Sequence, residues 1–303
     1  MGAGHSHGSP AGHTGGRYRT RLAAAFVLVA AFFVIELVTG VISGSLALIS
    51  DAGHMAADVV ALGAALVATK IATRPDSTGR RTYGSYRAEV FASGLTVVIM
   101  LGVSVYVVVE AVARINADAE VSSTAMLVVG VIGLAINVVT MMLLRAGSKE
   151  SLNVKGAYFE VVSDAAGSVG VIVAGLLVAG TGNGLWDTIV ALAIGIFVAV
   201  RAVVLGRQVL AVLGQHIPEG MELEDVVADL ESVPGVADIH DLHIWTLTSG
   251  MAVATAHLVV DDGASAQTVL VSAQRALAER HHIEHATLQV EAVKGKQCHE
   301  LGW

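Results

Sequence analysis

Long hydrophobic segments alternate with short polar ones over the first two thirds of the chain. A helix needs about 20 apolar residues to cross a bilayer. Six segments meet this length, at residues 22–43, 46–69, 88–112, 122–144, 157–179 and 185–205. The pattern therefore predicts a bundle of six transmembrane helices over residues 21–208, preceded by a polar, glycine-rich tail at residues 1–20.

Shorter periods replace these segments in residues 209–303. Apolar residues recur at helical spacing in 221–233 and 264–280, and they alternate as in strands in 236–246, 251–260 and 285–293. The order αββαβ predicts a small α+β domain whose sheet has one unusually polar face.

The charges divide at the same place. Of the 303 residues, 54% are hydrophobic and 15% are charged, against roughly 25% charged in soluble domains, and mean hydropathy is +0.69. Residues 1–208 carry 14 Lys and Arg against 12 Asp and Glu, whereas residues 209–303 carry 4 against 14. An acidic domain argues against a nucleic-acid partner. Cys298 is the single cysteine, which excludes a disulfide framework and a thiolate zinc cage within one chain.

Basic residues of short loops remain cytoplasmic, so their positions predict the orientation. They cluster in alternate loops: Arg17, Arg19 and Arg21; Lys70, Arg74, Arg80, Arg81 and Arg87; Arg145, Lys149 and Lys155. We therefore expect both termini to be cytoplasmic. The protein is expected to reside in the cell inner (plasma) membrane. The N-terminal tail, with His5, His7 and His13, is expected to be disordered and could hold metal loosely.

Two predicted spans contain clusters of ionisable residues. The second holds Asp51, His54 and Asp58 on one helical face, and the fifth holds Glu160 and Asp164 at i and i+4. An Asp near the centre of a span costs about 2.5–3.5 kcal/mol, so each needs an explanation. Imidazole and carboxylates are ligands of Zn²⁺. Simple hydrogen bonding between helices is the alternative, but four of the five groups are acids and neither span holds a Lys or Arg.

Other polar residues in the spans have weaker interpretations. Glu36 and Glu110 could lie on an ion pathway, and Asp51 is a separate pathway candidate. Asn137 is interpreted as a hydrogen bond between helices. Asp187 is interpreted as the N-cap of the sixth span. Glycines 167, 170 and 175 are expected to allow close packing of the fifth helix.

Histidines gather in the C-terminal domain. Strand alternation places His243 on the face of Trp245 and His240 on the opposite face. A second metal site is predicted from His243, His257 and Glu291, with His240 or His285 and with Cys298 or His299 as further candidates. Histidines at ordinary surface positions are the alternative. His281 and His282 are expected to cap the carbonyls of a helix end.

These motifs resemble one known family. The segments GSLALISDAGHMAAD, RRTYGSYRAEVFAS, HDLHIWTLTSG, ATAHLVV and TLQVE are similar to those of the cation diffusion facilitators, in the bacterial zinc/cadmium/cobalt efflux branch, and the resemblance runs from about residue 19 to 298. It implies a homodimer with six spans per protomer, a ferredoxin-like cytoplasmic domain that dimerises and binds metal, and export of cations in exchange for protons. Carried onto this chain, the transport site is His54, Asp58, Glu160 and Asp164.

One residue of that site departs from the family. Glu160 stands where the family usually has histidine, which makes the ligand set harder. Zn²⁺ is the expected transported and regulatory ion, with Co²⁺, Cd²⁺, Fe²⁺ and Mn²⁺ as alternatives.

Two other classes of function remain. A membrane-anchored metal sensor would need only the soluble domain. A membrane metalloprotease would need a His-Glu-x-x-His motif, which the sequence lacks, and a phosphate-binding loop for ATP-driven transport is also missing. The sequence thus predicts a metal/proton antiporter rather than an enzyme.

Overall fold

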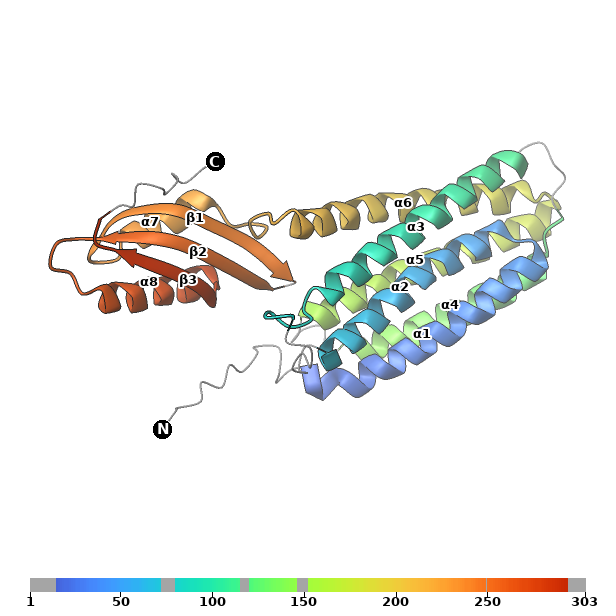
Figure 1. The fold of residues 1–303 in the computed structure, drawn as a ribbon. Helices are drawn as coiled ribbons and strands as arrows, with labels where there is room; N and C mark the ends of the chain where they lie inside the picture. Colours follow the sequence, from blue (N-terminus) through green and yellow to red (C-terminus); the bar gives the residue numbers. More distant parts are fainter. Residues whose placement is uncertain (1–14, 72–79, 115–119, 146–151, 249, 294–303) are drawn as a thin grey trace. The chain divides into compact units, whose positions relative to one another are not determined.

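The computed structural model describes residues 15–71, 80–114, 120–145, 152–248 and 250–293, which form eight helices and three strands (Figure 1). The three tail histidines, Cys298 and His299 lie outside the described residues. The chain divides into two compact units, residues 1–70 with 92–206 and residues 71–91 with 207–303. Each is described by itself.

Six long helices correspond to the six predicted spans. They are α1 (Gly15–Ser43), α2 (Leu46–Ile71), α3 (Ala88–Arg114), α4 (Ser123–Leu144), α5 (Leu152–Thr181) and α6 (Leu185–Leu213). Hydropathy predicts the membrane-embedded part of a helix and not its polar extension. The prediction therefore missed the first residues of α1, which begins at Gly15. Residues 15–20, expected in a disordered tail, are helical.

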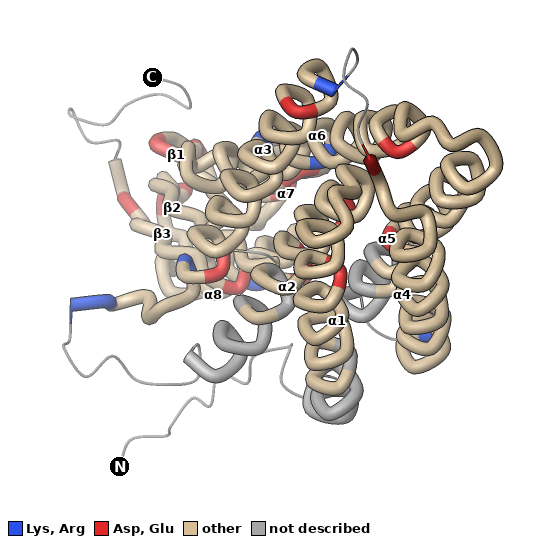
Figure 2. Tube along the Cα trace, turned by 90° about the vertical axis from the view of Figure 1, so that its right-hand side faces the viewer, with Lys and Arg blue, Asp and Glu red and all other residues tan. Residues whose placement is uncertain are grey.

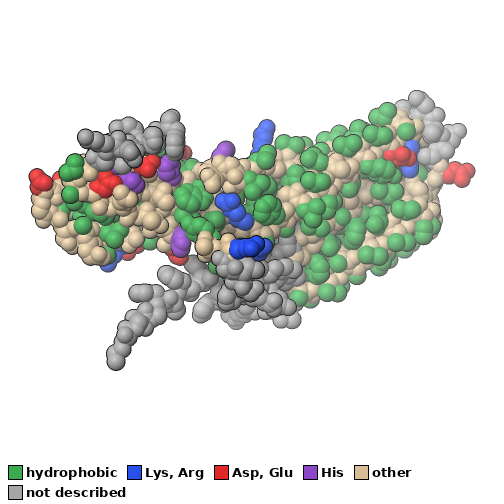
Figure 3. All heavy atoms as spheres, viewed as in Figure 1, with side chains coloured by type: hydrophobic (Ala, Val, Ile, Leu, Met, Phe, Trp, Pro, Cys, Tyr) green, Lys and Arg blue, Asp and Glu red, His purple; other side chains and the backbone are tan. Residues whose placement is uncertain are grey.

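The outer surface of these helices is apolar. Large side chains such as Ile42, Val98 and Met142 are 81%, 66% and 71% exposed, and Figure 3 shows hydrophobic side chains over the visible face of the helices. Among the described residues, α1, α3, α4, α5 and α6 qualify by length and hydropathy as membrane spans. Helix α2, which carries the ionisable cluster, is not among these five. Such a surface is stable against lipid and unfavourable in water, so the chain is a multi-pass membrane protein.

Asp187 joins the start of α6 to the start of α2. Its buried carboxylate accepts hydrogen bonds from Ser45 Oγ at 2.6 Å, from the Leu46 amide at 2.7 Å and from the Ala47 amide at 3.1 Å. The first amides of a helix have no partner within the helix. Asp187 therefore caps α2, and its interpretation as the cap of its own helix was wrong because the bond joins residues far apart in sequence.

A hydrogen bond between helices was correctly predicted for Asn137. Its side-chain amide on α4 donates to Ser168 Oγ on α5 at 3.3 Å, where both residues are buried. The same two helices approach closely at Gly175, where an added Cβ would lie 3.1 Å from Leu127. Small residues at this contact let the two backbones come together.

The C-terminal domain contains α7 (Leu223–Glu231), β1 (Val236–Thr248), β2 (Met251–Val260), α8 (Ala266–His281) and β3 (His285–Glu291). Strands β1 and β2 pair antiparallel, and β3 pairs parallel to β2 after the crossover through α8. Apolar residues of α7 and α8, among them Leu230 and Leu277, form one core with Ile244 and Leu258 of the sheet. The predicted ferredoxin-like αββαβ domain is confirmed.

A β-bulge in β1 changes which residues share a face. The pairing shifts between His240 and His243, and Asp241 has a φ of 53°. His240 lies opposite His257 and His243 lies opposite Thr255, and these β2 residues are two positions apart, so all four share a face. The prediction that His240 and His243 point in opposite directions was wrong, because the bulge adds a residue that regular alternation does not include.

Candidate metal sites

The first cluster lies between α2 and α5. His54 and Asp58 are one turn apart on α2, and Asp164 reaches them from α5. His54 Nε2 lies 3.8 Å from Asp58 Oδ2 and 3.3 Å from Asp164 Oδ1. One ligand atom of each residue can be chosen so that all three lie within 4.8 Å of one another. This spacing suits a single cation held by three side chains.

Burial makes a positive charge at this cluster favourable. His54 and Asp164 are each 3% exposed, and Nδ1 of His54 is buried with no hydrogen-bond partner among the described residues. Carboxylates removed from water are stable when they are protonated or held by a cation. Either a metal ion or protons would therefore stabilise the carboxylates of this cluster.

Glu160 is the fourth residue of the predicted set. It belongs to α5, one helical turn before Asp164, but its side chain lies outside the described part of the structure. The structure thus brings together three of the four predicted residues, and Glu160 stays a prediction.

Two further acids lie in the bundle interior. Glu36 of α1 is 1% exposed and Asp51 of α2 is 2% exposed, and the two carboxyl groups are neighbours. Glu36 Oε2 is buried with no hydrogen-bond partner among the described residues. An ideal Cβ on Gly167 would lie 2.5 Å from Asp51 Oδ1, so this glycine makes room for the carboxylate as well as for a neighbouring helix.

Arg201 was missed in the sequence. Its Nη1 atom on α6 lies 3.0 Å from His54 Nε2, and its guanidinium carbon lies 5.9 Å from the centre of the Phe197 ring. The second and fifth spans contain no Lys or Arg, as the sequence showed, but the sixth span brings Arg201 to the cluster. An arginine inside the predicted span 185–205 was the available signal, since a charged residue there needs a partner.

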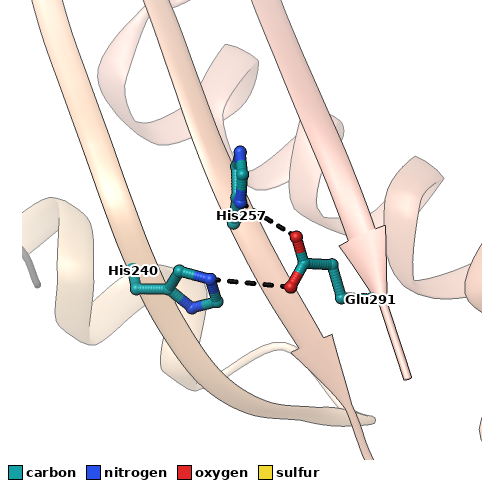
Figure 4. A group of neighbouring side chains, drawn as sticks. All are labelled: His240, His257 and Glu291. Atoms are coloured by element: carbon teal, nitrogen blue, oxygen red, sulfur yellow. Dashed lines mark ion pairs between the residues drawn. The ribbon is translucent and has the colours of Figure 1, made fainter. Parts of the chain in front are cut away.

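The second cluster lies on the open face of the C-terminal sheet (Figure 4). His240 of β1, His257 of β2 and Glu291 of β3 come together, with His257 Nδ1 2.9 Å from Glu291 Oε1 and His240 Nε2 3.6 Å from Glu291 Oε2. The two imidazole rings are 5.3 Å apart. Neither ring nitrogen of His240 makes a hydrogen bond within the part of the chain that the structure describes, although the side chain is 0% exposed. A metal ion would satisfy such a nitrogen.

Asp241 is a further candidate ligand that strand alternation could not indicate. Its Oδ2 lies 3.8 Å from His257 Nε2, and its Oδ1 lies 3.2 Å from His243 Nε2. The bulge gives Asp241 this position. His243 thus adjoins the cluster through Asp241, while His285 stands six residues from Glu291 on β3, about 20 Å along the strand.

His281 makes an ion pair in place of the predicted cap. Its Nε2 lies 2.8 Å from Asp229 Oδ2 on α7, and Arg280 also pairs with Asp229. Desolvation alone would raise the pKa of Asp229, but the hydrogen bonds from Arg280 and His281 outweigh it and lower this pKa below its ordinary value. His282 is the C-cap of α8, with a φ of 55° and its backbone N–H donating to the Leu277 carbonyl, so the predicted cap is confirmed at His282.

A membrane bundle with few charged positions along its helices (Figure 2), an internal His and carboxylate cluster and a second cluster on an α+β domain define a membrane protein built to bind metal. Residues 22–213 match the model of the cation efflux transmembrane domain, and residues 218–293 match that of the cation efflux protein cytoplasmic domain. The chain belongs to the cation efflux family, as the resemblance predicted.

Several curated relatives match nearly the whole chain. The metal cation efflux system protein CzcD of Cupriavidus metallidurans is 43% identical over 98% of this chain and 93% of its own. The cadmium, cobalt and zinc/H(+)-K(+) antiporter of Bacillus subtilis is 32% identical over 92% and 91%, and zinc transporter ZitB of Escherichia coli is 32% identical over 97% and 95%. The solved metal-bound C-terminal domain of the CzcD transporter from Cupriavidus metallidurans aligns at 40% identity with 23% of this chain and 99% of its own, with a TM-score of 0.23.

Proposed function

We propose that this protein exports divalent metal cations, zinc first among them, in exchange for protons. The observation that carries the proposal is the convergence of His54, Asp58 and Asp164 between two helices of a membrane bundle. The names of the relatives, which include a zinc transporter and a cadmium, cobalt and zinc antiporter, support metal cations as the cargo.

The chemistry of the ligands couples the cargo to protons. His54 binds a metal only as the neutral imidazole, and Asp58 and Asp164 bind it as carboxylates, so metal binding releases the protons that these groups hold. When the site opens to the other side, protons reload the same groups and the metal leaves. Alternating access of one buried site then gives exchange without ATP.

Glu160 is proposed as the fourth ligand and as the residue that sets selectivity. One imidazole with three carboxylates is a harder set than two imidazoles with two carboxylates, so it discriminates less strongly in favour of Zn²⁺. Co²⁺, Cd²⁺, Fe²⁺ and Mn²⁺ are the alternative cargoes. Glu160→His should raise the ratio of zinc flux to manganese flux, measured with both ions in the same vesicles.

The C-terminal domain is proposed to sense cytoplasmic metal. His240, His257 and Glu291 would hold the regulatory ion, with Asp241 and His243 beside it, and two protomers would associate through this domain as a homodimer. The domain division is proposed as tail 1–20, translocation domain 21–208 and cytoplasmic domain 209–303, with both termini in the cytoplasm and the bundle in the inner membrane.

Zinc uptake into proteoliposomes under an imposed pH gradient tests the proposal. Asp58→Ala and Asp164→Ala should each reduce the flux to the level of protein-free vesicles. Ser104→Ala is the matched control, because Ser104 is buried in the same bundle but bonds only its own helix at Met100 O in the interactions described. A metal sensor would bind zinc with no flux in the parent protein. Undiminished flux in both Asp variants would refute the site.

A further inference from the structure

Arg201 contacts the histidine of the proposed transport cluster. Its Nη1 lies 3.0 Å from His54 Nε2, the nitrogen that lies 3.3 Å from Asp164 Oδ1 and 3.8 Å from Asp58 Oδ2. The guanidinium therefore contacts the cluster directly, at the nitrogen that faces both carboxylates.

The chemistry of this contact fixes who donates. A guanidinium has only donors and stays charged at any physiological pH. Arg201 therefore donates to the lone pair of His54 Nε2, which places the proton of the neutral ring on Nδ1. A metal ion that binds through Nε2 uses the same lone pair, so the guanidinium and the metal cannot both engage it.

Charge makes the competition stronger. The guanidinium carries one of the positive charges that Asp58 and the buried Asp164 require, and a divalent ion brings two more. Two cations at contact distance repel each other strongly in a partly dehydrated site. The Phe197 ring, 5.9 Å from the guanidinium carbon and 6.2 Å from the His54 ring centre, offers the displaced guanidinium an aromatic face.

We propose that Arg201 is an internal counter-cation that competes with the transported metal for His54 and the carboxylates around it. It compensates the acids between transport cycles, and it weakens metal binding so that the ion can be released. Arg201 is therefore a positioning residue that acts through His54, and this inference rests on the proposed transport function. A contact that merely ties α6 to α2 is the competing explanation.

Removing the charge separates the two explanations. In Arg201→Gln the metal no longer competes with a cation, so zinc should bind the transport cluster at least about tenfold more tightly, while maximal flux falls because release slows. A purely structural contact would give weaker binding, or unchanged binding with lower stability. Arg201→Lys keeps the charge and should retain an affinity close to that of the parent.

The experiment uses the full chain. Zinc binding is measured by competition titration in detergent, and the binding lost in Asp164→Ala is assigned to the transport cluster. Zinc flux is measured in proteoliposomes. Arg207→Gln is the matched control, since it removes an exposed arginine from the same helix, and its affinity should equal that of the parent.

Each outcome has one meaning. Tighter binding with slower flux in Arg201→Gln, but not in Arg207→Gln, supports the counter-cation. Unchanged or weaker zinc binding in folded Arg201→Gln overturns it, and if that variant does not fold, weaker binding in Arg201→Lys does the same. Absence of flux in the parent protein would instead refute the transport function.

Discussion

His54 Nε2 on α2 lies 3.3 Å from Asp164 Oδ1 on α5. This contact joins the two helices at the point where the metal is proposed to bind. Both helices contribute candidate ligands, so a cation bound there would stabilise one arrangement of the two helices. A shift of either helix would separate these ligands. Metal affinity and helix position would then be coupled, which alternating access requires.

Gly167→Ala should impair transport because it displaces the Asp51 carboxylate. The new Cβ would lie 2.5 Å from Asp51 Oδ1, too close for any side chain, so the carboxylate or the helix must move. Overpacking of this kind costs about 1–3 kcal/mol. We expect a lower melting temperature and reduced zinc flux. Gly170→Ala is the control, because its Cβ would meet Val190 at an ordinary 3.5 Å. Equal flux in the two variants would contradict the role of Gly167.

Asp187→Ala should destabilise the bundle without touching a metal ligand. It removes the acceptor of two amides and one hydroxyl at the start of α2, which are buried and would be left unpaired. The expected loss is about 1–3 kcal/mol. Thermal unfolding in detergent measures this loss. The melting temperature of Asp187→Asn, which keeps one acceptor oxygen, should lie between those of the parent and Asp187→Ala. A melting temperature of Asp187→Ala equal to the parent's would show that the cap is dispensable.

The helices and the cluster on α2 could be predicted because hydropathy and helical spacing are local properties of the sequence. His54 and Asp58 share a face for this reason, and so do the residues that alternate in β2. The partner of Asp187 and the approach of Arg201 to His54 could not be predicted, because tertiary packing sets them. The bulge at Asp241 was missed since an extra residue in a strand leaves no periodic signal, and it reversed the predicted face of His240.

His240→Ala should remove metal binding by the C-terminal domain. The buried ring offers two nitrogens that make no hydrogen bond to any described residue, next to His257 and Glu291. We expect one class of zinc sites to disappear from a titration of the full-length protein, while flux at saturating zinc persists. His285→Ala is the control, as His285 is exposed and distant from Glu291 along β3. Retention of every zinc site in His240→Ala would remove this residue from the site.

Acid should weaken the contact of α7 with α8 in a defined direction. The pKa of Asp229 is lowered by its bonds to Arg280 and His281, so the ionised form stabilises the fold above the unfolded-state pKa of about 4. That contribution is lost as pH falls through the lowered pKa. Hydrogen exchange of α8 should be faster in Asp229→Asn than in the parent at neutral pH. The difference should vanish below the folded pKa, and a constant difference at all pH values would argue against the pair.

Proton movement driven by zinc tests the central claim most directly. Proteoliposomes with no imposed pH gradient carry an internal pH dye, and zinc is added outside. The account predicts that the interior becomes alkaline as zinc enters, since protons leave in exchange, and that Asp164→Asn abolishes the zinc entry and the pH change together. Zinc entry with no change of internal pH, or a pH response that survives in Asp164→Asn, would contradict metal/proton exchange at this cluster.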